Sequence, residues 1–149
     1  MSGLSNQARR SHTRALLMQA HYQQQLDGTS RAELARQFAE RREYERVDPE
    51  YFDTLLTQSL ADTVALDAEI VSLADRSAEQ LNPVEIAILR VALTELRERI
   101  DIPYRVVINE AVALAHRFAA EAAHKYINAV LDRAARTHRA VEVKGRERA

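Results

Sequence analysis

Residues 82–118, NPVEIAILRVALTELRERIDIPYRVVINEAVALAHRF, decide the fold. Asn82 can cap a helix, Pro83 suits the first helical position, and Glu85 stands where a capping-box acid reaches back. Apolar side chains then cover most of this helix, so we expect other helices to surround it, with Glu85 as an exposed acid at the edge of the apolar surface. After an elbow at residues 100–103, a second helix carries apolar residues at spacings of three and four: Val107, Ile108, Ala111, Leu114, Ala115 and Phe118.

Composition favours one all-α domain. The chain has 149 residues, is 46% hydrophobic and contains only three glycines and three prolines. It shows no alternating run of β-branched and aromatic residues bounded by turn residues. We predict a single helical domain at residues 1–139 and a frayed, basic C-terminal tail at residues 140–149, where the apolar rhythm fades into KGRERA.

The absence of cysteine and of long apolar segments indicates in which cellular compartment the protein is expected. With no cysteine there are no disulfides and no thiolate metal sites, which suits a reducing environment. No apolar stretch of about 18 residues and no signal peptide is present. We expect a soluble, cytoplasmic protein.

Charge is unevenly distributed along the chain. The net charge is −1, but residues 1–26 carry three arginines and no acid, residues 27–75 are strongly acidic, and residues 132–149 are basic again. Phosphate contacts act within roughly 8 to 10 Å, so a local basic patch can bind nucleic acid although the total charge is near zero.

Helix signals also occur on both sides of residues 82–118. Asp27-Gly28 ends the first helix, Ser30 with Glu33 forms a capping box, and Asp48-Pro49 repeats the cap-then-proline pattern. The remaining predicted helices cover residues 8–26, 30–38 with a continuation to Tyr44, 48–60, 66–73 and 123–138.

Residue patterns typical of catalysis or of metal binding are absent. None of the five histidines has an HxxxH or HExxH neighbour, and no glycine-rich phosphate loop occurs. Acid pairs such as Glu95 with Glu98 are helical neighbours in charged surroundings, and we interpret them as surface residues. The sequence predicts no enzyme, no metal and no cofactor.

Several motifs within residues 8–135 resemble the NusB family of bacterial transcription antitermination factors. The weaker matches are QARRSHTRALLMQAHY (7–22) and VDPEYF (47–52). The most specific matches are VExAILRxALxEL (84–96), DxPYxVxINEA (101–111), AExxHK (120–125) and NxVLD (128–132).

The resemblance implies a fold and partners. It implies an all-α fold of about seven helices in two small bundles, so that residues 1–139 form a NusB-like domain. Family members pair with the ribosomal protein that doubles as NusE, and the pair binds boxA RNA within the RNA polymerase antitermination complex. The resemblance implies no enzymatic activity.

Site residues follow from the matched positions. The arginine-rich RNA-binding motif of the family falls on Arg9, Arg10 and Arg14, and the family's HK motif makes Lys125 a further phosphate contact, although it is nearly as well explained as a solvated lysine. Guanidinium groups suit this role because they bind phosphates bidentately and stack on unpaired bases. The NusE-facing residues fall on Tyr22 and Glu85, although Tyr22 also fits the core-facing rhythm of its helix.

Some positions depart from the family pattern. Ser11 and His12 stand where further basic residues are common, which predicts weaker RNA binding. Ala122 and Ala123 replace an Asp-Ser pair, so the last helix should lack its N-terminal cap, at a cost of about 0.5 to 2 kcal/mol.

Two alternative functions fit the same resemblance. NusB-like domains also form the leading domain of RNA cytosine methyltransferases. A self-associating helical module, such as a homodimer, would use the same apolar faces. For the leading hypothesis we expect weak RNA binding by the chain alone and tighter binding with the ribosomal partner.

Overall fold

The computed structural model describes residues 3–74 and 80–148. Within these residues the secondary structure is entirely helical, which confirms the all-α prediction. The elements are α1 (Asn6–Asp27), α2 (Arg31–Ala39), the short 3-10 helix η1 (Arg42–Arg46), α3 (Pro49–Leu60), α4 (Thr63–Leu73), α5 (Pro83–Glu98), α6 (Tyr104–Phe118), α7 (Ala123–His138) and α8 (Ala140–Arg148).

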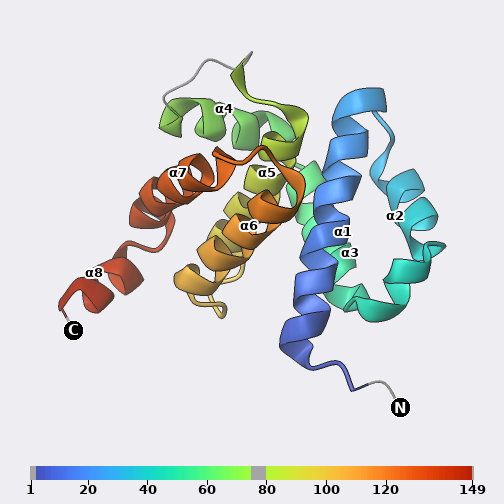
Figure 1. The fold of residues 1–149 in the computed structure, drawn as a ribbon, viewed down its shortest axis with the longest axis horizontal. Coiled ribbons are helices and arrows are strands. Elements are labelled where there is room, and N and C mark those ends of the chain that lie inside the picture. The colour runs from blue at the N-terminus through green and yellow to red at the C-terminus, as the bar shows by residue number, and fades with distance from the viewer. Residues whose placement is uncertain (1–2, 75–79, 149) are drawn as a thin grey trace.

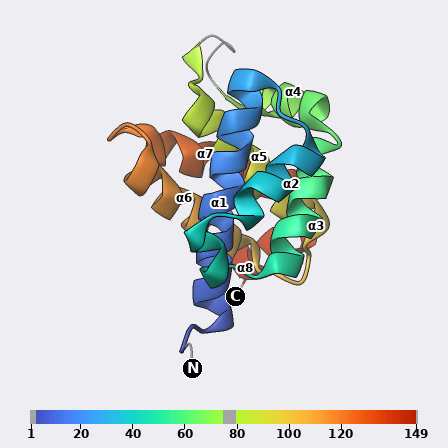
Figure 2. The ribbon, with the colours of Figure 1, turned by 90° about the vertical axis from the view of Figure 1, so that its right-hand side faces the viewer.

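Helix α5 is the centre of the fold. It packs against α1, α3, α4, α6 and α7, and Figures 1 and 2 show it among these helices from two directions. Its residues Leu89, Leu93 and Leu96 are almost completely inaccessible to solvent. The prediction that other helices surround this segment is therefore confirmed, and two groups of helices share α5.

Helix ends lie where the sequence predicts them. The side chains of Ser30, Asp48 and Asn82 each accept the backbone N–H three positions on, at 3.2, 3.2 and 2.9 Å. Gly28 ends α1 with φ at 71°, in the left-handed region that glycine tolerates. Helix α7 begins after Ala122 with no side-chain cap, as the missing Asp-Ser pair predicted.

Arg139 fixes the elbow between α5 and α6. Its buried guanidinium donates to the carbonyl oxygens of Leu96 at 2.8 Å and Ile102 at 2.8 Å. It also donates to the backbone oxygens of Glu95 and Arg99. Arg139 thus supplies donors to the Leu96 carbonyl in the last turn of α5 and to the Ile102 carbonyl in the elbow.

Residues 140–148 form helix α8, contrary to the frayed tail that we expected. The carboxylate of Glu142 accepts from Arg139 at 2.7 Å and from the backbone N–H of Tyr104 at 2.9 Å. Val143 is buried against the core. Glu142 and Val143, together with an exposed pair between Arg136 and Glu147, attach this helix to the rest of the fold.

Arginines of α5 face α4. Arg90, with 6% of its surface exposed, donates to both carboxylate oxygens of Asp67, at 2.7 and 2.6 Å. Arg97 of α5 pairs with Glu69 of α4.

No helix in the described part of the chain combines the length and the apolar character that crossing a membrane requires.

Candidate nucleic-acid interface

The first half of α1 carries the predicted arginines. Ser5 caps this helix by accepting the backbone N–H of Ala8 at 3.1 Å. Arg10 and Arg14 lie four positions apart and therefore share a face of the helix. Arg9 points toward the link between η1 and α3, where its Nη1 donates to the carbonyl of Val47 at 3.3 Å.

Arg14 is a buried ion-pair residue with only 3% of its surface exposed. Its Nε and Nη2 donate to Glu95 at 2.9 and 2.8 Å, and its Nη1 donates to Glu110 at 3.1 Å. Burial by itself lowers the pKa of Arg14, but the hydrogen bond and charge of Glu95 outweigh it and raise the pKa above its usual range. Arg14 is therefore a fixed positive charge whose donors already have carboxylate acceptors.

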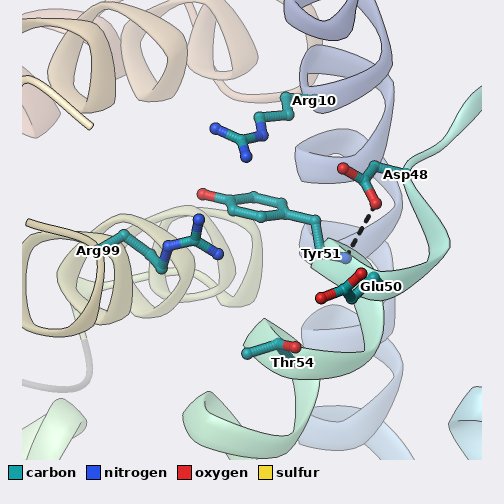
Figure 3. A pocket seen from close by; sticks show the side chains of 6 residues that line it. All are labelled: Arg10, Asp48, Glu50, Tyr51, Thr54 and Arg99. Carbon is teal, nitrogen blue, oxygen red and sulfur yellow. Dashed lines mark hydrogen bonds between the residues drawn. The ribbon is translucent and has the colours of Figure 1, made fainter. Parts of the chain in front are cut away.

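Tyr51 lies between two guanidinium groups. Arg10 from α1 lies 4.5 Å from the centre of its ring, and Arg99 from the end of α5 lies 4.7 Å from it (Figure 3). The Tyr51 hydroxyl donates to Glu95 at 2.5 Å. Burial, and then the negative charge of Glu95, raise the pKa of Tyr51. Arg10 thus lies within cation–π distance of a ring whose hydroxyl stays neutral.

Arg10 lines two hollows at the protein surface. One has a volume of about 140 Å³ and is lined by Arg10, Arg99, Tyr51 and polar residues of α3. The other, of about 340 Å³, lies between the start of α1 and the elbow. The Nε of Arg10 is buried and has no hydrogen-bond acceptor within the described part of the chain. Arg10 is therefore partly buried, lies against Tyr51 and borders both hollows.

Lys125 lies on a different element from the arginines. It is exposed on the first turn of α7. Its neighbour His124 stacks on His116 of α6, with ring centres 4.2 Å apart, and so fixes the start of α7 to the end of α6. The structure brings the three arginines together on α1 and leaves Lys125 at a separate position.

The two predicted partner residues occupy adjoining helix ends. Gln25 near the end of α1 donates to the carbonyl of Pro83 at the start of α5, at 2.9 Å. Tyr22 is 37% exposed, so it is not a core residue. Glu85 is only 4% exposed, and its Oε1 has no hydrogen-bond donor among the described residues. The expectation that Glu85 is an exposed acid is wrong, because this residue is buried although it lies in the first turn of α5.

Sequence reasoning missed the residues that organise the arginines. Glu95, expected at the surface, is 1% exposed and binds both Arg14 and Tyr51. The sequence analysis also assigned no role to Glu110, which binds Arg14, or to Arg99, which lies against Tyr51. The VDPEYF match contains Tyr51 and was the available signal, but no local pattern indicates which arginines will cover its ring. Across residues 3–74 and 80–148, no group of three or more histidines and acids is arranged to hold a metal ion.

The sequence profile of the NusB family matches residues 11–136. The chain belongs to the NusB family. It is 42% identical over 146 residues to the transcription antitermination protein NusB of Alcanivorax borkumensis, covering 98% of this chain and 97% of that protein. It is 45% identical over 136 residues to NusB of Teredinibacter turnerae, covering 91% of this chain and 92% of that protein.

Solved NusB structures share this fold. A T. maritima NusB structure has a TM-score of 0.71 and 25% identity, covering 85% of this chain and 90% of that chain. A crystal structure of the antitermination factors NusB and NusE with double-stranded RNA contains a chain with a TM-score of 0.74 and 23% identity, covering 85% and 96%. Arg9, Arg10 and α8 lie outside the residues that the NusB profile matches.

Proposed function

We propose that this chain is an RNA-binding transcription antitermination factor. In this proposal it pairs with the NusE ribosomal protein, and the pair binds boxA-type RNA within the RNA polymerase antitermination complex. Membership of the NusB family and the names of relatives at 42 and 45% identity support this role. The observation that carries it is the Arg10 guanidinium, held against Tyr51 at the edge of two surface hollows.

The arginines have different parts in this proposal. Arg10 contacts the RNA directly, because a planar guanidinium binds phosphate through two N–H groups and also stacks on bases. Arg9 adds positive charge beside it. Arg14 compensates the charges of Glu95 and Glu110, which would otherwise repel phosphates near Arg10. Lys125 provides a second phosphate contact from α7.

Tyr22 and Glu85 form the proposed contact with NusE. A buried carboxylate oxygen without a donor is costly, and in this proposal the Glu85 side chain turns outward so that a lysine or arginine of a ribosomal protein supplies that donor. The exposed ring of Tyr22 on the adjoining helix end offers apolar surface beside it. Binding at this site leaves Arg10, on the first half of α1, accessible to RNA.

Fluorescence anisotropy of a labelled boxA RNA tests the function. The titration uses this chain alone and with NusE, over a series of salt concentrations. We expect weak binding alone, tighter binding with NusE, and a steep loss of affinity with salt because basic residues displace counterions from RNA. No RNA binding in either condition, with NusE still bound, would reduce the chain to a protein-interaction module.

A further inference from the structure

Arg99 and Glu50 lie on the same side of the Tyr51 ring and line one hollow. Figure 3 shows the guanidinium of Arg99 and the carboxylate of Glu50 on the side of the ring opposite to Arg10. They form no ion pair, since Arg99 instead uses its Nε and Nη2 on Asp101, at 3.1 and 3.0 Å. Its Nη1 has no acceptor, and Glu50 has no donor, among the described residues.

We infer that this hollow of about 140 Å³ is a pocket for one unpaired guanine base of the bound RNA, an inference that rests on the proposed RNA-binding function. Arg99 donates to the base, and Glu50 accepts from it. Arg99 and Glu50 are thereby additional residues of the RNA site that determine sequence preference.

The charges around the hollow exclude simpler ligands. A phosphate only accepts hydrogen bonds, and the carboxylates of Asp48 and Glu50 would repel it. An ammonium group only donates, and Arg10 and Arg99 would repel it. A neutral, planar ligand with acceptors on one edge and donors on another can bind both the arginines and the carboxylates that line the hollow. Nucleobases have this character, and they are accessible in single-stranded RNA.

Guanine matches the geometry of both side chains. Its O6 and N7 form an acceptor pair for the donor fork of arginine, which is the commonest specific arginine contact with a base. Its N1–H and N2–H groups form a donor pair for a carboxylate. Both faces of the Tyr51 ring already carry guanidinium groups, so the base is held by hydrogen bonds along its edges and does not stack on the ring.

The test compares RNA nonamers of uridine that carry one central guanosine, adenosine, cytidine or inosine, or no replacement. Affinities are measured by fluorescence anisotropy at fixed salt. The wild-type chain should bind the guanosine RNA about tenfold more tightly than the adenosine RNA. Inosine, which lacks the N2 amine, should bind with intermediate affinity.

Two variants identify the side chains responsible. Glu50→Gln should remove the difference between guanosine and inosine, because the amide is a weaker acceptor for N2–H than the carboxylate. Arg99→Lys should reduce the preference for guanosine while keeping the positive charge. Glu45→Gln, which removes an exposed carboxylate on η1 outside this hollow, is the matched control and should behave as wild type.

The outcomes separate this inference from the proposed function. Equal affinity for all nonamers, with normal salt dependence, would overturn the guanine pocket and leave RNA binding intact. A guanosine preference that survives in both Glu50→Gln and Arg99→Lys would also overturn it. Absence of binding to every nonamer and to boxA RNA would overturn both. Circular dichroism of each variant confirms that it is folded.

Discussion

Arg14 on α1 and Glu95 on α5 form a two-point ion pair in the protein interior, with their side chains only 4 and 1% exposed. We expect Arg14→Ala to lower the free energy of unfolding by about 3 to 5 kcal/mol, because it leaves Glu95 buried without its counter-charge. The Arg14→Met/Glu95→Leu double variant should recover much of this loss. Urea denaturation measures all three proteins.

An exposed pair provides the control for this measurement. Arg36 and Glu40 pair at 3.0 Å on the surface of α2, where solvent screens the interaction. Arg36→Ala should therefore change the urea midpoint little. Equal losses from Arg14→Ala and Arg36→Ala would contradict the structural importance of the buried pair.

Arg10→Lys should weaken RNA binding although the charge is kept. Lysine lacks the planar donor fork that lies against Tyr51. Arg10→Ala should weaken binding further and lower the salt slope by about 0.7 if one single-strand phosphate contact is lost. Anisotropy with boxA RNA over a salt series measures both quantities, and Arg42→Ala, an exposed arginine on η1, is the control. Unchanged affinity of both Arg10 variants would reject Arg10 as the RNA contact.

His21 should make stability depend on pH. It is fully buried, its Nε2 lies 2.6 Å from the hydroxyl of Ser59, and burial together with the charge of Arg90 lowers its pKa from 6.5 to about 3. Between these two values the unfolded chain binds one more proton than the folded chain. The free energy of unfolding should therefore fall by about 1.4 kcal/mol for each pH unit below 6.5.

Urea denaturation between pH 6.5 and 5 isolates this contribution from most carboxylates. His21→Gln should show a shallower decline over this range, because glutamine takes up no proton in the unfolded chain. The comparison uses slopes and not absolute stabilities, since the substitution also alters packing. Identical slopes for the two proteins would contradict the assignment to His21.

Gly28→Ala should destabilise the end of α1. Gly28 has φ at 71°, and its N–H donates to the carbonyl of Gln24 at 2.9 Å. A side chain would meet no atom within 4 Å, so the cost is conformational, about 1 kcal/mol. Gly28→Asn should cost less, because asparagine tolerates this region better. A thermal shift equal for both variants would show that backbone conformation is not the cause.

Local signals predicted the helices well. Caps at Ser30, Asp48 and Asn82 depend on residues three positions apart, and the predicted last helix, residues 123–138, has the observed bounds of α7. Such features need no knowledge of distant contacts. The resemblance to the NusB family gave the arrangement of the helices, which local signals alone do not.

Burial of charged residues was the main thing that sequence reasoning missed. Glu95 looked like a surface acid, because its only visible neighbours were other charged residues on the same helix. Its partner Arg14 is 81 positions away, and only the packing of α1 on α5 brings the two together. Glu85 was also expected at the surface, because its burial is not visible in its own helix. Residues 140–148 were expected to be frayed, because the contacts of Glu142 and Val143 with distant residues are not visible in the local sequence.

The elbow between α5 and α6 depends on the order in which the chain is made. Arg139 follows Leu96 by 43 positions and Ile102 by 37, yet it provides the donors for both carbonyls. During synthesis on the ribosome, α5 and α6 emerge while these carbonyls have only water as a partner. The loop that contains Arg99 and Asp101 therefore gains its hydrogen bonds from Arg139 only after Arg139 has left the ribosome.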